Sequence, residues 1–338
     1  YGEPVVYVKD ASRSVGVCQS LITPAQKAPF AAQVAADHER RREQHAGRSI
    51  KLPEVGLAEA RANRRPIDWA AYLPTVPRRP GVQVFEDYPL EQLVEYIDWM
   101  PFFNAWEFAG KFPDILTDPV VGEAASNLYA DARRMLRQVV AEKWLRVRAV
   151  VGLFPAAAVG DDIEVYADES RSQVLATLNH LRQQKSKAPG QPHECLADYV
   201  APRDSGVRDY VGAFAVTAGL GIEPWVARFE AAHDDYSSIL LKALADRFAE
   251  ACAEHFHERV RREFWGYAPA EQLTNQELVR EAYRGIRPAP GYPACPDHTE
   301  KRVIFDLLDA EANTGMALTE SYAMTPAAAV SGLYFAHP

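Results

Sequence analysis

The sequence has few cysteines, no long hydrophobic run and no excess of basic residues, and each absence narrows the class of protein. Four cysteines in 338 residues, with no CxxC pair, are too sparse for a disulfide scaffold and favour a reducing, cytoplasmic setting. No stretch reaches the roughly 18 to 20 apolar residues of a membrane span, and no signal region opens the chain. The 37 basic and 46 acidic side chains leave a formal charge of −9, which disfavours a general nucleic-acid binder.

The familiar catalytic signatures are missing too. There is no GxGxxG, GxxxxGK[ST], GxSxG or HExxH motif, which excludes the easily read nucleotide-binding and hydrolase classes. His255 and His257 lie two positions apart and would point to different sides of a helix. Cys295 and His298 supply two ligands where zinc takes three or four from protein. We therefore predict no metal site in this chain.

What is present is the composition of a folded protein. Hydrophobic residues make up 48% and charged residues 25%, and the length allows about two domains or one domain with an appendage. The chain begins at Tyr1 and residues 5–8 read as the end of a strand, so we expect a piece of a longer protein. A charge-dense helix after Pro24 and a proline-rich connector over residues 61–80 lead us to interpret residues 1–85 as a partly helical linker. We expect compact folding over residues 86–338.

Separated strands and helices follow, with no fixed-period repeat. The longest signal is an apolar position at every fourth residue from Leu244 to Phe264, which predicts one long helix over residues 236–264. Asp246, Glu250 and Glu254 form an acidic row on its flank, which is usually solvent-facing but could line a cleft. We predict strands over residues 145–154, 161–166, 210–217, 318–324 and 330–335, a turn over 155–160, and helices over 118–143, 168–184, 274–282 and 301–308.

The segment from Arg287 to Pro296 carries the most chemical information. Its four prolines remove amide donors and leave carbonyls that can accept from a ligand amine. Arg287 can hold a carboxylate through two hydrogen bonds, Gly291 permits a close approach, and Tyr292 offers an aromatic face. The combination suits a zwitterionic, adenine-bearing small molecule. A rigid proline-rich surface loop is an equally good interpretation of these residues alone.

The run YRGIRPAPGYPACPDHTEK over residues 283–301 resembles the S-adenosylmethionine-binding segment of the activation (reactivation) domain of cobalamin-dependent methionine synthase. Further matches follow in the same order as in that family, and together they span essentially the whole chain. They are YIDW at residues 96–99, PFF at 101–103, VVGLFPA at 150–156, GDDIE at 160–164, HDDY at 233–236, HERVR at 257–261, LTESYAM at 318–324 and SGLYF at 331–335.

The resemblance implies an α+β fold: a C-shaped single domain with a twisted antiparallel sheet flanked by helices. It implies a reactivation module that binds S-adenosylmethionine and positions its methyl group for reductive methylation of inactive cob(II)alamin. The parent enzyme would be a methyltransferase that makes methionine from homocysteine and methyltetrahydrofolate. Cobalamin would be held mainly by the adjacent cobalamin-binding domain, zinc only by an absent module, and a flavodoxin-type protein would supply the electron.

The resemblance also names the residues of the binding site. Arg287 would bind the ligand's carboxylate, Asp98 would accept from its ammonium, and Gly291 and Tyr292 would shape the wall that faces the cobalamin. Ala289 would offer backbone contacts near the adenine, and Glu250 and Glu281 would lie near the ribose and amino-acid parts. No residue is needed as a nucleophile or general base, so we predict no catalytic residue in this chain.

Two other functions stay open. The chain could be a docking module that caps the cobalamin domain and recruits the electron donor, through arginine clusters at residues 40–42, 133–137 and 259–262. Solvated helix faces are the simpler interpretation of each cluster. The chain could also reactivate a different corrinoid protein.

Overall fold

The computed structural model describes residues 4–8, 11–48 and 53–337, and the chain divides into two compact units between Val55 and Gly56. The first unit contains two helices that pack on each other, α1 (Ala11–Ile22) and α2 (Pro24–Arg48). The strand predicted at residues 5–8 is wrong, since these residues form no strand with any other described part of the chain. Among the described residues, no helix is long and apolar enough to cross a membrane.

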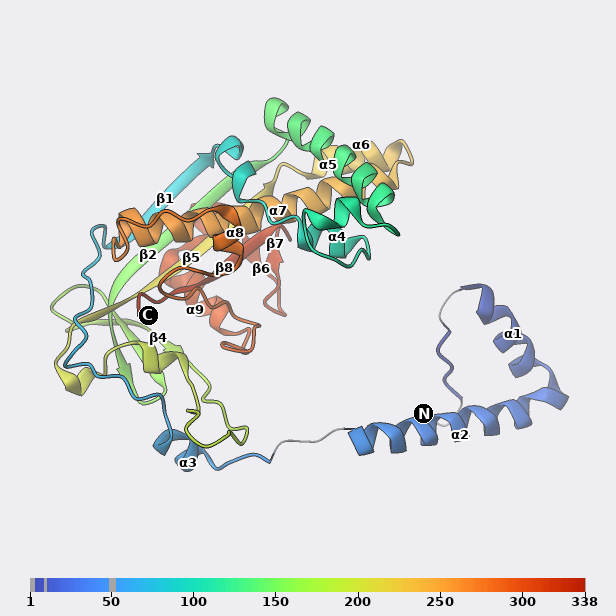
Figure 1. Cartoon of the computed structure of the whole chain (residues 1–338), viewed down its shortest axis with the longest axis horizontal. Helices are drawn as coiled ribbons and strands as arrows, with labels where there is room; N and C mark the ends of the chain where they lie inside the picture. The colour runs from blue at the N-terminus through green and yellow to red at the C-terminus, as the bar shows by residue number, and fades with distance from the viewer. Residues whose placement is uncertain (1–3, 9–10, 49–52, 338) are drawn as a thin grey trace. The chain divides into compact units, whose positions relative to one another are not determined.

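The second unit is built on a six-stranded antiparallel sheet (Figure 1). The strand order is β4-β3-β2-β5-β8, and β1 pairs with the first half of β2. A separate two-stranded hairpin is formed by β6 and β7. The strands are β1 (Gly81–Tyr88), β2 (Arg146–Val159), β3 (Asp162–Tyr166), β4 (Val174–Asn179), β5 (Asp209–Leu220), β6 (Ala317–Leu318), β7 (Met324–Thr325) and β8 (Ala329–Tyr334).

Helices cover both faces of this sheet, which explains why β2 and β5 are buried along most of their length. On one face, Val151 and Phe214 belong to the core that includes α7 (Asp235–Arg259), with α4 and α5 beyond it. On the other face, Val150 and Ala213 pack with α9 and α10. The other helices are α3 (Leu57–Ala62), α4 (Met100–Ala105), α5 (Gly122–Glu142), α6 (Glu223–Ala231), α8 (Asn275–Val279), α9 (Glu300–Leu308) and α10 (Ala310–Thr314). The expected α+β class with an antiparallel sheet is confirmed.

The long helix α7 begins where the sequence supplies a cap. The Asp234 carboxylate accepts a hydrogen bond from the backbone N–H of Ser237 at 2.9 Å, which satisfies one free donor of the first turn. The regular helix ends at Arg259, and residues 260–264 form one wider turn in which the Trp265 N–H bonds to the Val260 carbonyl. The apolar seam still faces inward through this turn, because Val260 and Phe264 are both fully buried.

Three further predicted elements are wrong. The strand predicted over residues 318–324 is instead a hairpin of two short strands, β6 and β7. Residues 168–184 hold strand β4 rather than a helix, because Leu178 pairs with Ile163 of β3 and tertiary pairing outweighs local propensity. Residues 155–160 are not a turn, because β2 continues through Pro155 to Val159. Pro155 falls between the part of β2 paired with β1 and the part paired with β3, so it is tolerated there.

The segment before β1 belongs to the second unit, so the expected boundary near residue 85 lies inside a strand. Over residues 63–80 this segment forms no helix or strand and contains one turn at residues 69–71, and hydrogen bonds hold its C-terminal end. The Trp265 indole N–H donates to the Thr75 carbonyl at 2.7 Å, and the Arg79 N–H donates to the Phe264 carbonyl at 2.8 Å. We call residues 56–80 the strap.

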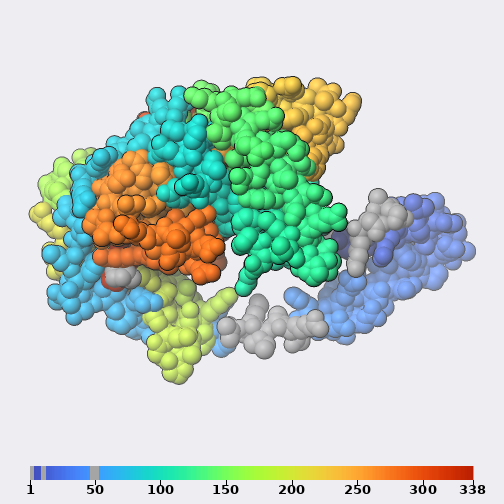
Figure 2. All heavy atoms as spheres, turned by 45° about the horizontal axis from the view of Figure 1, so that its top comes forward, coloured from blue at the N-terminus to red at the C-terminus, as the bar shows by residue number. Residues whose placement is uncertain are grey.

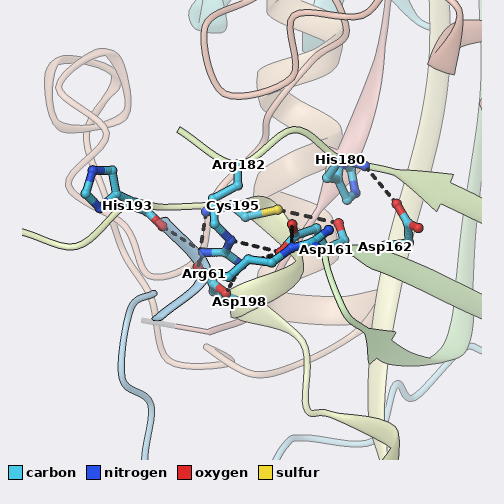
Figure 3. Close-up of polar contacts among 8 residues, drawn as sticks. All are labelled: Arg61, Asp161, Asp162, His180, Arg182, His193, Cys195 and Asp198. Carbon is cyan, nitrogen blue, oxygen red and sulfur yellow. Dashed lines mark hydrogen bonds and ion pairs between the residues drawn. The ribbon is translucent and has the colours of Figure 1, made fainter. Parts of the chain in front are cut away.

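A buried ionic cluster fastens the N-terminal end of the strap (Figure 3). The Arg182 side chain is 1% exposed and pairs with Asp161 at 2.8 Å and with Asp198 at 2.7 Å. Arg61 of the strap pairs with the second oxygen of Asp161 at 2.8 Å. A few residues further on, the Asn63 side chain contacts the His193 ring at 2.9 Å. The strap is thus tied to the loops after β2 and β4 by charge as well as by backbone contacts.

Candidate functional site

The segment after Gly285 lies along the free edge of β8, the last strand of the sheet. Ile286 and Phe335 exchange both backbone hydrogen bonds, at 3.0 and 3.1 Å, and the Leu333 N–H donates to the Pro288 carbonyl at 2.9 Å. Pro288 and Pro290 have no N–H to continue the ladder, so the pairing stops and the chain turns away. The Pro288 carbonyl is therefore used by β8, so the prediction that the carbonyls of this segment are free for a ligand is wrong at this residue.

Two glycines make this arrangement possible. A Cβ atom at Gly332 would lie 2.6 Å from the Pro288 carbonyl oxygen, so only glycine allows the segment to approach β8. Gly291 has a φ of +102°, and a Cβ atom there would lie 2.4 Å from Cε1 of His298. The following residue, Tyr292, projects outward and is 64% exposed. In Figure 2 the orange surface around residues 270–290 borders a hollow that separates it from the green surface around residues 110–130.

Arg287 projects from this segment onto α7. Its Nη2 atom donates to Oε2 of Glu254 at 2.8 Å, and the two side chains are only 17% and 13% exposed. Burial would lower the pKa of the Arg287 guanidinium, but the Glu254 carboxylate outweighs burial and raises it, so Arg287 stays charged. The Nε atom of Arg287 is buried and has no partner among the described residues. The guanidinium therefore keeps donors for a further acceptor.

A second buried arginine supports the first. Arg261 is fully buried, is held through two of its nitrogens by Glu271 at 2.7 and 2.8 Å, and lies 4.1 Å from the centre of the Tyr283 ring. Beside it the buried His257 ring stacks on Tyr334 at 5.2 Å between ring centres. Burial and the nearby arginines lower the pKa of His257 well below its usual value, so the ring is neutral.

The structure brings Glu250 and Glu281 into the same neighbourhood. For Arg287, burial lowers the pKa, and Glu254 and, more weakly, Glu250 raise it. For Glu254, burial raises the pKa, Arg287 and Arg261 lower it, and Glu281 adds a smaller increase. Neither Glu250 nor Glu281 accepts a hydrogen bond from a described residue. Glu254 itself was not predicted as a site residue, although the acidic row of α7 was the signal that could have found it.

Asp98 and Ala289 are less closely connected with Arg287. The Asp98 carboxylate accepts a hydrogen bond from the Met100 N–H at 3.0 Å, and no hydrogen bond or ion pair of the described residues links it to Arg287. The backbone carbonyl of its neighbour Ile97 accepts a hydrogen bond from the Asn275 side chain of α8 at 3.4 Å. The Ala289 carbonyl accepts from the Tyr292 N–H at 3.3 Å and so closes the turn.

The other candidate features have structural partners. Within the described part of the chain, no three His, Cys, Asp or Glu side chains are grouped to hold a metal. His255 bonds to the Tyr88 hydroxyl at 2.8 Å, away from the buried His257. The arginine clusters are paired locally: Arg40 with Asp37, Arg42 with Glu39, Arg134 with Asp131, Arg259 with Glu263 and Arg262 with Glu258. This pairing removes most of the free positive charge that a docking surface would use.

Comparison with known proteins agrees with this geometry. The family model for the activation domain of vitamin B12-dependent methionine synthase matches residues 89–338. The crystal structure of the MetH reactivation domain bound to AdoHcy is 58% identical in sequence, with a TM-score of 0.82 over 85% of this chain and 87% of that chain. The family-model match covers strands β2 to β8, α7 and the segment from Arg287 to Tyr292. The chain therefore belongs to the activation-domain family of vitamin B12-dependent methionine synthase and is a reactivation domain of that enzyme.

Proposed function

We propose that this chain binds S-adenosylmethionine between the 286–292 segment and α7, and presents its methyl group to a cobalamin held by the neighbouring domain. The observation that carries the proposal is the buried, charged Arg287, which uses one N–H on Glu254 and keeps the rest. The relative whose structure is 58% identical was crystallised with AdoHcy, the demethylated form of the same ligand.

The residues present fit the chemistry of this ligand. S-adenosylmethionine carries a carboxylate, an ammonium and a sulfonium, so it needs one cation and several acids around it. Arg287 supplies the cation, and the carboxylates of Glu250 and Glu281 lie within electrostatic range of the Arg287–Glu254 pair. Asp98 would receive the ammonium, and the exposed Tyr292 ring and the Gly291 turn would form the outer wall towards the methyl acceptor.

The chain's own residues would contribute binding and orientation. Cobalamin, when bound next to this domain, supplies the nucleophile that accepts the methyl group. Arg287 would fix the amino-acid end of the donor, and the turn closed by Ala289 and Tyr292 would fix its other end, so that the methyl group points outward. Holding a donor in line in this way supplies catalysis without a general base.

The wider setting follows from family membership. The domain works within a multidomain methionine synthase, with the cobalamin domain as its partner. We propose that the whole enzyme makes methionine from homocysteine and methyltetrahydrofolate, in the cytoplasm, and that a flavodoxin-type protein donates the electron. The free thiols of Cys195, Cys252 and Cys295, all buried, support a reducing compartment. Salt-dependent binding of flavodoxin to this chain, measured by calorimetry, tests the electron donor.

Calorimetric titration of the 338-residue chain with S-adenosylmethionine tests the binding proposal. Wild-type protein should bind, and Arg287→Ala should raise the Kd roughly tenfold or more, since a charged hydrogen bond contributes about 1.5 kcal/mol or more. Arg280→Ala is the matched control, because Arg280 is an exposed arginine at the end of α8. Absence of binding by the wild type, or equal affinity of Arg287→Ala, would overturn the proposal.

A further inference from the structure

Glu254 occupies a special place among the acids near the proposed ligand. It lies five residues before the C-terminal end of helix α7, and its carboxylate is the group that the Arg287 guanidinium contacts directly. Its other oxygen, Oε1, is buried, has no hydrogen-bond partner among the described residues and lies 3.9 Å from Nη1 of Arg261. The Glu254 carboxylate thus lies between the guanidinium groups of Arg287 and Arg261.

The far guanidinium is fixed more firmly than the near one. Arg261 is fully buried, bound through Nε and Nη2 by Glu271, and packed on the Tyr283 ring. Arg287, in contrast, has one hydrogen bond to a described residue, from Nη2 to Glu254. A long arginine side chain with one contact depends on that contact for its place and angle.

We propose that Glu254 is a positioning residue: it holds the Arg287 guanidinium at the place and angle at which its free N–H groups meet the ligand's carboxylate. Arg261, which is itself held by Glu271, attracts the second oxygen of Glu254 from the other side. The inference rests on the proposed function. It adds a residue that acts through Arg287 and does not touch the ligand.

Position and charge can be separated with two variants. Glu254→Asp keeps the charge but withdraws the carboxylate by about 1.5 Å, the length of one carbon–carbon bond. Glu254→Gln keeps the length and an acceptor oxygen but removes the charge. If Glu254 acts by position, Asp should weaken S-adenosylmethionine binding at least tenfold, and Gln should weaken it less than Asp does. Glu258→Asp is the matched control, because Glu258 is an α7 acid paired with Arg262 rather than Arg287.

A second ligand separates positioning from general damage. 5′-Methylthioadenosine has the adenosine and the thioether but lacks the carboxylate, so its affinity, measured by competition, should change less than twofold in Glu254→Asp. In an Arg287→Ala background, Glu254→Asp should cause no further loss of S-adenosylmethionine affinity.

Three results would overturn the inference. They are Glu254→Asp binding S-adenosylmethionine as the wild type does, equal loss of both ligands, or a full further loss in the Arg287→Ala background. Failure of the wild-type chain to bind S-adenosylmethionine at all would instead overturn the proposed function, and the thermal midpoints of all variants show whether each one is folded.

Discussion

Replacing Arg182 with methionine should destabilise the second unit strongly. Asp198 is 5% exposed at its side chain and would keep only backbone donors such as the Cys195 N–H at 3.1 Å. Asp161 would keep Arg61 alone. Removing one partner of a buried ion pair costs about 3–5 kcal/mol, because the remaining charge is buried without compensation. For a unit of this size, that cost corresponds to a thermal midpoint roughly 10 °C lower.

Urea unfolding at pH 7 measures this free energy directly. Arg203→Met is the matched control, since Arg203 pairs with Glu164 at 2.9 Å but is 60% exposed, so its loss should cost less than about 1 kcal/mol. A cost below about 1 kcal/mol for Arg182→Met would refute the reasoning that the buried pair cannot be broken cheaply.

The loss of stability caused by Arg182→Met should depend on pH in a definite direction. Burial would raise the pKa of the Asp161 carboxyl, but hydrogen bonds from Arg61 and Arg182 outweigh burial and hold it below its usual value. A lowered pKa in the folded state adds stability above the ordinary value of about 3.8, and this stability is lost as the pH falls through the lowered value. The difference in the free energy of unfolding between wild type and Arg182→Met should therefore become smaller below about pH 4.

Three other predictions use the same protein. Burial raises the pKa of Asp209 to about 6. The protonated carboxyl therefore contributes to stability below about pH 4, and this contribution is lost as the pH rises through 6. Urea unfolding should show that the unfolding free energy of wild type falls by on the order of 3 kcal/mol relative to Asp209→Asn between pH 4 and 7. Gly291→Ala forces a Cβ against His298 at a φ of +102°. Calorimetry should show S-adenosylmethionine binding about tenfold weaker, and urea unfolding should show the protein less stable by about 1–3 kcal/mol because of the backbone strain. The exposed Cys18 should react rapidly with a thiol reagent, whereas Cys252, fully buried and with its pKa raised by burial, should react only on unfolding.

The elements that could be predicted are those whose burial is regular. The seam from Leu244 to Phe264 repeats every four residues, and β5 is buried along almost its whole length, so both follow from hydrophobic pattern. Strand β4 lies at the sheet edge, with Val174 and Leu175 nearly half exposed, so its burial pattern is too weak to read. Only its pairing with β3 makes it a strand.

The residues of the site also differ in whether the sequence could predict them. Arg287, Gly291 and Tyr292 lie in one continuous motif, so resemblance to the family was sufficient to select them. Glu254 lies 33 positions before Arg287, and the two meet only because the 286–288 segment docks on β8 above α7. Contacts of this kind depend on the tertiary fold, which no local pattern encodes.

The docking of residues 286–288 on β8 means that this side of the proposed binding site is already ordered before the ligand binds. An open edge strand invites pairing with another chain, and here the arginine-bearing segment occupies that edge while its prolines end the ladder. The segment is therefore part of the sheet framework and cannot swing away as a lid without exposing β8. Arg287 is in place before the ligand arrives, so little ordering entropy is lost on binding. A movement that brings the methyl group to its acceptor must therefore carry the sheet together with this segment.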